Sequence, residues 1–499
     1  MEVQILVKAV VSIILVGILG LAFRLYRELV GNTEKVRSAL RKQGIGGPPP
    51  TLLLGTVLEI KKARTAKPPP TPTGAPTHHN CADVQQICFS TTHQYTSSFH
   101  IYIYIYIYIL AVLLLEYPSS SVSGGGGNHQ ETSIHLQLLE LAVTSGLIAA
   151  YRRYVVLIRI LQGMIKLIRE SAMTLIDVWN NMVEAKGGAA DIKIDQHMRS
   201  FSGDVISKAC FGSDYSKGGE IFVKLRALLE CASKKGFSFG IPFMKCLPTK
   251  SNREAWAPEK DLRTLILKVV KERNEVVTRR TCCKRFSGRS SEQCPDATDS
   301  FIVDNCKNIY LAGFETTALA ATCCLMLLAA NPEWQERVRG EVLGVCDGQA
   351  PNNDTIRKMK LLSVAINESL RLYPPVAIMS IEVFEEMKFG GVHVPKGVNI
   401  WALVLTLHTD PEVWGADSYQ FNPDRFANGA CKLPHLYMPF GVGPRVCLGQ
   451  HLASAELKIL LSLILSNFSF TLSPTYVHSP TLNLVIEPEH GVDLNVKKV

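Results

Sequence analysis

A ten-residue segment near the C-terminus, Phe440–Gly449, constrains the fold of this chain more than any other feature. It reads Phe-Gly-Val-Gly-Pro-Arg-Val-Cys-Leu-Gly, so Cys447 lies among glycines that let the backbone approach a large planar group closely. An apolar helical pattern over Leu452–Leu465 follows. Backbone N–H groups and the dipole at such a helix N-terminus favour a thiolate. A lone cysteine is more often a small core residue, but this context indicates a ligand-binding sulfur.

Arg445 lies two residues before the cysteine, where its charge can neutralise a carboxylate of the same ligand. Together these groups fit a haem iron bound through a cysteine thiolate. The segment also matches Phe-x-x-Gly-x-Arg-x-Cys-x-Gly at every specified position, and in this the chain resembles the cytochrome P450 monooxygenases. The resemblance covers about residues 1–77 and 144–499. It implies a mainly α fold with small β-sheets, one N-terminal transmembrane helix, and haem b whose iron is held by Cys447, with Phe440, Gly441, Arg445 and Gly449 around the cofactor.

A Glu-x-x-Arg pair, Glu368 and Arg371, has the i, i+3 spacing that places both side chains on one helix face. Alone, such a pair is more often a surface ion pair of small worth. Here it precedes Leu-Tyr-Pro-Pro and resembles the family's Glu-x-x-Arg helix, and Asn422–Phe426 resembles the family's loop that supplies a second arginine. The resemblance assigns Glu368, Arg371 and Arg425 to a structural triad that maintains the fold and retains haem.

A long apolar pattern over Asp299–Ala330 predicts a helix that ends where Asn331 precedes a proline. Polar residues inside such a helix usually mark a solvated stripe or a local bend. In the family the segment matching Ala312–Thr317 crosses the haem face, and its glycine, here Gly313, makes room for dioxygen. The resemblance therefore implies that Thr316 hydrogen-bonds the activated oxygen and that Glu315 relays protons for O–O cleavage. By position relative to the motifs, Asn308, Ala312, Thr316 and residues 377–379 are candidates for lining the substrate pocket.

The N-terminus predicts a membrane anchor within residues 1–30. Residues 5–23 are apolar or small except for Lys8 and Ser12, a length that suits one membrane-spanning helix. No small-residue cleavage site follows, and the lysines and arginines cluster after the span, which predicts a cytosolic catalytic domain. With the family resemblance, this indicates a single-pass protein of the endoplasmic reticulum membrane. We interpret residues 31–83 as a linker, with a stiff hinge at Gly46–Pro50.

Residues 84–141 are aberrant in composition. Ile101–Ile109 alternates isoleucine with tyrosine, and Ser119–Gly127 is of low complexity. The alternation is a strand pattern with two apolar faces, an aggregation hazard; a second membrane span, short at fifteen residues for 101–115, is a weaker alternative. Because ATA-TAT repeats encode Ile-Tyr, our hypothesis is that this segment is translated non-coding sequence. We assign residues 142–499 to the haem domain.

Two departures from the family pattern concern the haem carboxylates. The nearest counterpart of the family's Trp-x-x-x-Arg motif is Ala149–Arg153, so Arg153 is present while the tryptophan is replaced by alanine. Ten residues beyond Arg371, where many members carry a further arginine, this chain has Ile381. Fewer donors are therefore expected for the haem carboxylates.

The 499 residues are 47% apolar, which excludes disordered and collagen-like proteins. The formal charge of +9 is mildly basic and does not indicate the dense stripe of lysine and arginine expected of a nucleic-acid-binding protein. The fourteen cysteines follow no disulfide-framework spacing and are expected to be reduced thiols.

Three segments resemble the plant clan that includes gibberellin-oxidising and secologanin-forming enzymes, the gibberellin branch most closely. These segments are Asn305–Tyr310, Met359-Lys360 and Pro395–Trp401. The resemblance implies a monooxygenase that takes electrons from NADPH through a separate cytochrome P450 reductase and uses O2 on a small hydrophobic substrate. A catalytically impaired product of a faulty gene is the alternative, and an isomerase or dehydratase that needs no reductase is a third possibility.

Overall fold

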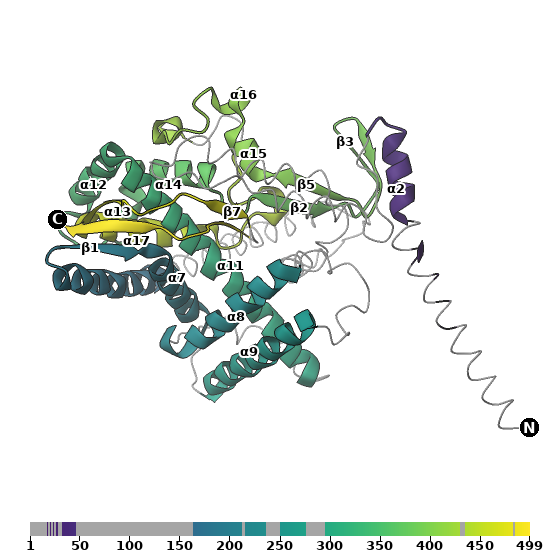
Figure 1. Ribbon diagram of the computed structural model, residues 1–499, viewed down its shortest axis with the longest axis horizontal. Helices are drawn as coiled ribbons and strands as arrows, with labels where there is room; N and C mark the ends of the chain where they lie inside the picture. Colours follow the sequence, from purple (N-terminus) through teal and green to yellow (C-terminus); the bar gives the residue numbers. More distant parts are fainter. Residues whose placement is uncertain are drawn as a thin grey trace, which may run out of the picture.

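Long helices joined by short strands make up the part of the chain that the computed structural model describes. That part comprises residues 32–45, 163–211, 215–235, 250–275, 295–429, 435–482 and 485–499, with isolated positions before residue 28. The predicted mainly α fold with small β-sheets is confirmed (Figure 1). The helices are 163–185, α2 (Asn32–Arg41), α7 (Ile194–Phe211), α8 (Tyr215–Lys235), α9 (Lys250–Glu275), α11 (Pro295–Ala330), α12 (Pro332–Cys346), α13 (Asn353–Lys358), α14 (Lys360–Leu372), α15 (Val404–Thr409), α16 (Pro411–Trp414) and α17 (Gln450–Asn467).

The strands of the described residues form one three-stranded and three two-stranded antiparallel sheets. The three-stranded sheet has the order β1-β9-β6, so the C-terminal strand lies between two others and joins the start of α7 to the end of α17. The strands are β1 (Ala189–Lys193), β2 (Ile378–Glu382), β3 (Met387–Phe389), β4 (Val392–Val394), β5 (Asn399–Leu403), β6 (Phe468–Leu472), β7 (Pro480–Leu482), β8 (Ile486–Pro488) and β9 (Asp493–Lys498).

Helix α11 runs through the middle of the molecule and belongs to two hydrophobic clusters (Figure 1). Its C-terminal half packs with α12, α14 and α17, whereas its N-terminal half packs with α8 and α9. It ends at Ala330, directly before Asn331-Pro332, as the sequence predicts. Among the described helices its segment Asp299–Ala330 alone is long and apolar enough to cross a membrane, but 78% of that window is buried in protein. It is a core helix, so its apolar composition reflects burial on all sides.

The other helices predicted from apolar spacing are also present. The pattern over 164–183 corresponds to helix 163–185, and Leu452–Leu465 lies inside α17. The pattern from Leu262 to Val277 corresponds to α9, which begins twelve residues earlier, at Lys250, and contains Pro258. The first part of α9 carries many charged residues, so apolar periodicity could not reveal it.

Several N-terminal predictions fall outside the described residues. These are the membrane anchor, apart from isolated positions, the Gly46–Pro50 hinge, the aberrant segment 84–141, and Arg153. Within the segment that we interpreted as a linker, residues 32–41 form α2, which lies beside the β3–β4 hairpin in Figure 1. The Gln43 side chain joins the two, because its Nε2 donates to the His393 carbonyl oxygen (3.0 Å) and its Oε1 accepts from the His393 N–H (2.8 Å).

Candidate functional site

The loop that carries Cys447 is held in shape by its own backbone. The Gly441 N–H donates to the Met438 carbonyl oxygen (3.0 Å), and the Cys447 N–H donates to the Phe440 carbonyl oxygen (2.8 Å). Gly441 has a φ of +74°, a left-handed conformation that strongly favours glycine. A short 3-10 helix, Gly443–Arg445, fills the turn between these hydrogen bonds. The sequence folds here into a tight loop that presents the cysteine just before α17, which begins at Gln450.

The Cys447 sulfur differs from the other described cysteines in its surroundings. Cys306, Cys323, Cys324 and Cys346 are buried, whereas Cys447 is half-buried. Burial raises the pKa of the Cys447 thiol, and hydrogen bonds from the Gly449 and Gln450 backbone N–H groups oppose that rise. The helix-terminal amides predicted from the sequence are therefore present, but they do not by themselves lower the pKa below its ordinary value.

This sulfur fits the haem-thiolate ligand that the sequence predicts. It belongs to a half-buried residue, it accepts backbone hydrogen bonds, and it lies on a rigid loop. Among the described residues no group of three or more His, Cys, Asp or Glu side chains could hold a metal ion. A haem needs only one protein ligand, because its macrocycle supplies four nitrogen ligands.

The other residues predicted around the cofactor have distinct roles in the loop. Phe440 is partly buried and packs against the large hydrophobic cluster, while Arg445 is exposed. A methyl group added at Gly449 would lie 4.0 Å from the Cys447 sulfur, an ordinary contact. The small size of Gly449 is thus not required by this neighbour, and what the residue supplies is its backbone N–H.

The α11 segment Ala312–Thr317 is fixed by α7. The Thr316 hydroxyl donates to the Ala312 carbonyl oxygen (2.6 Å), one turn earlier, and the Ser202 hydroxyl of α7 donates to the Gly313 carbonyl oxygen (2.8 Å). A side chain at Gly313 would meet Ile206, whose Cδ1 lies 2.6 Å from the position of an added Cβ. The role of Gly313 toward dioxygen stays a prediction; in this structure Ile206 of α7 lies in the space where a side chain at this position would begin.

Glu315 lies in a cluster of four charged side chains. Its carboxylate pairs with Arg199 of α7 (Nε to Oε2, 3.2 Å) and with Arg226 of α8 (Nη1 to Oε1, 3.0 Å). Both arginines also pair with Oε2 of Glu487 in β8, at 3.1 and 3.4 Å, which completes these four residues. Outside them, Arg226 also pairs with the exposed Glu230 of its own helix (Nε to Oε1, 3.4 Å). Burial lowers the pKa of Arg226, but the nearby carboxylates of Glu315 and Glu487 outweigh it, so the pKa is raised overall. The sequence-predicted proton relay is thus an ion-paired carboxylate, and we refer to these four residues as the open cluster.

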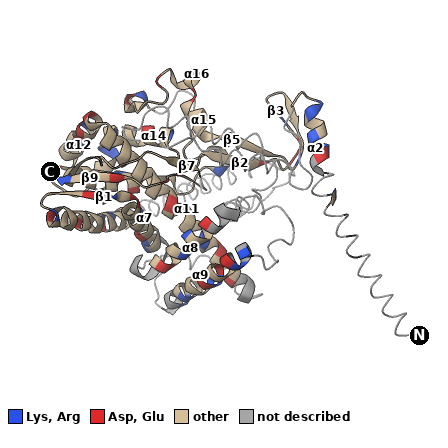
Figure 2. Ribbon diagram, in the orientation of Figure 1, with Lys and Arg blue, Asp and Glu red and all other residues tan. Residues whose placement is uncertain are grey.

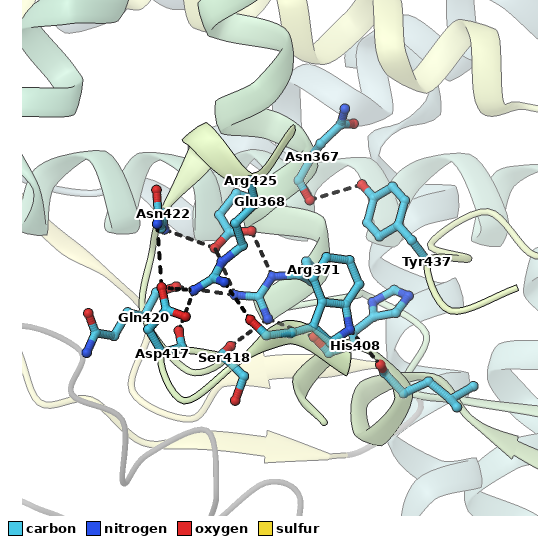
Figure 3. Close-up of polar contacts among 12 residues, drawn as sticks. Asn367, Glu368, Arg371, His408, Asp417, Ser418, Gln420, Asn422, Arg425 and Tyr437 are labelled. Carbon is cyan, nitrogen blue, oxygen red and sulfur yellow. Dashed lines mark hydrogen bonds and ion pairs between the residues drawn. The ribbon is translucent and has the colours of Figure 1, made fainter. Parts of the chain in front are cut away.

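The structure brings the predicted triad of Glu368, Arg371 and Arg425 together at the buried face of α14 (Figure 3). Arg371 donates twice to the Glu368 carboxylate, at 2.7 and 2.8 Å, and both side chains have no exposed surface. The Glu368 carboxylate also accepts the backbone N–H of Asn422 (2.9 Å) and pairs with Arg425 Nε (3.4 Å). We refer to Glu368, Arg371 and Arg425 as the closed cluster.

Backbone carbonyls complete the closed cluster. The remaining Arg371 N–H groups donate to the carbonyl oxygens of His408 (2.7 Å), Ser418 (2.5 Å) and Gln420 (3.2 Å), as Figure 3 shows. His408 in turn accepts the backbone N–H of Met438 at its Nε2 (2.9 Å). Because the Met438 carbonyl oxygen accepts from Gly441, this chain of contacts joins the closed cluster to the Cys447 loop.

A family model described as cytochrome P450 matches residues 152–495. This chain belongs to the cytochrome P450 family. Membership implies a haem-thiolate cofactor and a redox partner, and it agrees with the half-buried Cys447 on its glycine-bearing loop.

Plant relatives of this cytochrome P450 cover its length to different extents. Cytochrome P450 714C2 of rice (Oryza sativa subsp. japonica) is 48% identical over 341 residues, 67% of this chain and 65% of that protein. Cytochrome P450 714B2 of rice is 38% identical over 535 residues, 100% of this chain and 98% of that protein. Cytochrome P450 714A2 of Arabidopsis thaliana is 35% identical over 533 residues, 98% of each. These relatives place the cytochrome P450 in the plant CYP714 family.

The β2 strand of this cytochrome P450 flanks the Cys447 loop. The Met379 sulfur lies 3.6 Å from where a side chain on Gly441 would begin, so the two segments touch. Ile381, two residues along β2, is 55% exposed, at the position where we expected the family's arginine. The loss of that donor therefore leaves an exposed apolar side chain, which costs little in folding but supplies no hydrogen bond to a haem carboxylate.

Sequence reasoning missed Arg199, Ser202, Arg226 and Glu487. Arg199 and Arg226 lie 116 and 89 residues from Glu315 along the chain. Glu315 itself could have indicated that basic partners exist, because a charged side chain buried inside an apolar helix needs an oppositely charged partner. Nothing local to the motif indicates which arginines supply it.

Proposed function

We propose that this cytochrome P450 is a monooxygenase that inserts one oxygen atom from O2 into a small hydrophobic substrate, a diterpenoid such as a gibberellin. The observation that carries the proposal is Cys447: a half-buried cysteine on a glycine-bearing loop whose sulfur is hydrogen-bonded by the amides that begin α17. Membership of the CYP714 family supports the plant setting, and the sequence resemblance to the gibberellin-oxidising branch supports the substrate class.

Cys447 would hold the haem iron, with Phe440, Gly441 and Gly449 in the same loop and Arg445 as a partner for a haem carboxylate. When bound, the haem supplies the reductive activation of dioxygen, for which a thiolate ligand is suited. The backbone N–H groups of Gly449 and Gln450 stabilise negative charge on the sulfur. The hydrogen bond from the Cys447 N–H to Phe440 keeps the sulfur in place.

Two side chains of the α11 segment, Thr316 and Glu315, would hold and transfer protons. The Thr316 hydroxyl holds its proton toward the Ala312 carbonyl oxygen and can turn to donate it elsewhere, while its oxygen remains an acceptor. Glu315 would supply the proton that replaces it, and it is the nearest carboxylate along the helix. Ser202 holds the Gly313 carbonyl oxygen, so the backbone between the two side chains is fixed.

A polar group on the same face of α11 suits an oxygenated diterpenoid. Asn308, Ala312 and Thr316 are spaced at four-residue intervals and therefore lie on one side of the helix. The Asn308 Nδ2 is buried and has no hydrogen-bond partner among the described residues. A buried donor of this kind is costly unless it is satisfied. We propose that it donates to a hydroxyl or carboxylate oxygen of the substrate and thereby orients it.

The partners and the location follow from the same proposal. Electrons would come from NADPH through a separate NADPH-cytochrome P450 reductase. The apolar N-terminus followed by lysines and arginines supports a single-pass anchor in the endoplasmic reticulum membrane with the haem domain in the cytosol. Residues 142–499 would form that domain.

The second candidate is a catalytically impaired product of a faulty gene model or a pseudogene. The Ile-Tyr alternation within residues 84–141 favours it, because a translated non-coding AT repeat would encode such a run. The intact motifs at Thr316 and Cys447 favour an enzyme. Sequencing the transcript separates the two: a spliced message without the repeat would mean that the gene encodes an enzyme and that this chain differs from its product.

The test uses the full chain with the reductase, NADPH, ¹⁸O₂ and a gibberellin. The proposal predicts a product that carries one ¹⁸O atom, and a product without ¹⁸O would overturn it. The Asn308→Leu variant sharpens the substrate claim. It is expected to raise KM about tenfold for the oxygenated diterpenoid, the loss of one good hydrogen bond. For a diterpenoid hydrocarbon without oxygen atoms, which serves as the matched control, KM should not rise.

A further inference from the structure

Two side chains of α7 hold one residue of α11, Gly313. The Ser202 hydroxyl donates to the Gly313 carbonyl oxygen (2.8 Å), and Ile206 lies where a side chain at Gly313 would begin. Ser202 and Ile206 are four residues apart and therefore share a face of α7. Both are buried, with exposed fractions of 0% and 5%. Gly313 is thus a point at which α7 fixes the path of α11.

The backbone of α11 is easiest to bend at this residue. A glycine inside a helix has no side chain to restrict its φ and ψ, unlike the neighbouring Ala312 and Phe314. The Thr316 hydroxyl donates to the carbonyl oxygen of Ala312, four residues earlier (2.6 Å), and such a hydrogen bond often bends a helix. Two consecutive carbonyls of α11 therefore accept hydroxyl groups, one from their own helix and one from α7.

The path of α11 at Gly313 determines where the Thr316 side chain lies. Thr316 follows Gly313 by three residues, so it lies one turn later on the same side of the helix. A change in φ or ψ at Gly313 therefore moves the Thr316 hydroxyl relative to the preceding part of α11. The Thr316 hydrogen bond to Ala312 stays within one turn of α11 and cannot oppose a movement of the whole turn. The Ser202 hydroxyl can oppose it, because it belongs to another element.

We propose that Ser202 is a positioning residue, which fixes α11 at Gly313 and thereby the place at which the Thr316 hydroxyl meets the reacting oxygen. The inference rests on the proposed monooxygenase function. In this role Ser202 transfers no proton, and its hydroxyl donates to the Gly313 carbonyl oxygen throughout turnover. Dioxygen that receives two electrons without a well-placed proton for O–O cleavage takes two protons from solvent and leaves as hydrogen peroxide. A displaced Thr316 therefore diverts the electrons of NADPH from product to peroxide.

The test compares Ser202→Val with Ser202→Thr in the full haem-loaded chain, because valine and threonine have nearly the same shape and differ in the hydroxyl. Each variant is assayed with the reductase, NADPH and a gibberellin, and both hydrogen peroxide and oxygenated product are quantified. We expect the peroxide-to-product ratio to be about fivefold higher in Ser202→Val than in Ser202→Thr, equivalent to about 1 kcal/mol. Ser202→Thr should stay close to wild type, and KM should be the same in all three proteins.

Amide hydrogen exchange of the same variants gives a readout that requires no turnover. In an α-helix the Thr317 N–H donates to the Gly313 carbonyl oxygen, the group that Ser202 holds. Exchange over residues 312–320 should therefore be faster in Ser202→Val than in Ser202→Thr, because local opening of this turn becomes easier. Exchange over residues 322–328, in the C-terminal half of α11, should be equal in the two variants, which would exclude a general loss of stability.

Ser207 provides the matched control. It lies on the same helix, it is equally buried, and its hydroxyl has no hydrogen-bond partner among the described residues. Ser207→Val should leave the peroxide-to-product ratio and the exchange over residues 312–320 unchanged. A Thr316→Val background tests the route of the effect: if Ser202 acts through Thr316, adding Ser202→Val to Thr316→Val should not raise the ratio further.

Equal peroxide-to-product ratios in Ser202→Val and Ser202→Thr would overturn the inference. The same rise in Ser207→Val, a further rise in the Thr316→Val background, or equal exchange over residues 312–320 would also overturn it. Should Ser202→Val fail to fold, Ser202→Ala and Ser207→Ala make the same comparison, and equal ratios in these two would decide against Ser202. Failure of the proposed function is distinguishable, because the wild-type chain itself would then give no ¹⁸O-labelled product.

Discussion

The closed and open clusters use the same side chains, glutamate and arginine, in two different ways. In the closed cluster Glu368 and Arg371 have no exposed surface, and Arg371 also donates to the backbone carbonyls of His408, Ser418 and Gln420. In the open cluster Glu315 is buried and the other three side chains are partly exposed, and the ion pairs among these four residues join side chains of different elements. Figure 2 shows acidic and basic residues on α7, α8 and α11, where the open cluster lies. The partners of Arg371 are fixed by the backbone, whereas those of Arg226 depend on side chains that can move.

This difference teaches that ion pairing alone does not define a role. Removing one partner of a buried ion pair costs several kcal/mol of folding free energy, because the other partner remains as an uncompensated charge. In the closed cluster, backbone carbonyls satisfy the remaining N–H groups of Arg371. In the open cluster each arginine has more than one carboxylate partner, so the loss of one carboxylate leaves neither guanidinium unpaired. The first arrangement suits retention of the fold around the Cys447 loop, and the second tolerates the loss of one of its carboxylates.

The largest expected effect follows from breaking the closed cluster. Glu368→Ala leaves Arg371 buried without its carboxylate, so the free energy of unfolding should fall by about 3–5 kcal/mol. Glu315→Ala leaves Arg199 and Arg226 with Glu487 and should cost about 1 kcal/mol. Urea denaturation of both variants measures the difference. Equal losses would contradict the distinction between the two clusters.

A smaller effect is expected from pH, through the histidine that joins the closed cluster to the Cys447 loop. Burial, and then the charge of Arg371, lower the pKa of His408 from 6.5 to about 4. Below pH 6.5 the unfolded chain binds a proton there and the folded chain does not. The free energy of unfolding therefore falls as pH drops from 6.5 toward 4, by up to about 3 kcal/mol.

His408→Gln tests this assignment, because a glutamine oxygen can still accept the Met438 N–H. Between pH 7 and pH 4.5 the variant should lose less unfolding free energy than wild type. His478, whose pKa burial lowers to about 4, remains in both and accounts for part of the residual slope. Parallel pH profiles in the two proteins would show that His408 does not titrate as described.

The parts of this structure that local sequence predicts are those whose cause is local. Helix α11 ends at Ala330 because a proline follows Asn331, and Glu368 meets Arg371 because residues three apart share a helix face. The loop of Cys447 follows from its glycines, two of which, Gly441 and Gly443, have a left-handed backbone. Each of these predictions depended on a few consecutive residues.

The remaining features could not be read from the sequence because they depend on packing between distant segments. Arg199, Arg226 and Glu487 reach Glu315 from three other elements, and no spacing along the chain indicates it. Gly313 is small because Ile206 of α7 lies against it. The charged start of α9 carries no apolar period and so gave no helix signal. Tertiary contacts determined each of these outcomes.

The central claim, that Cys447 holds a haem as its thiolate ligand, is tested most directly by the absorption spectrum of the reduced full chain under carbon monoxide. A thiolate ligand at Cys447 predicts a red-shifted Soret band for the wild-type chain and its loss in Cys447→Ala. A wild-type spectrum without the red-shifted band, or an unchanged band in Cys447→Ala, would contradict it.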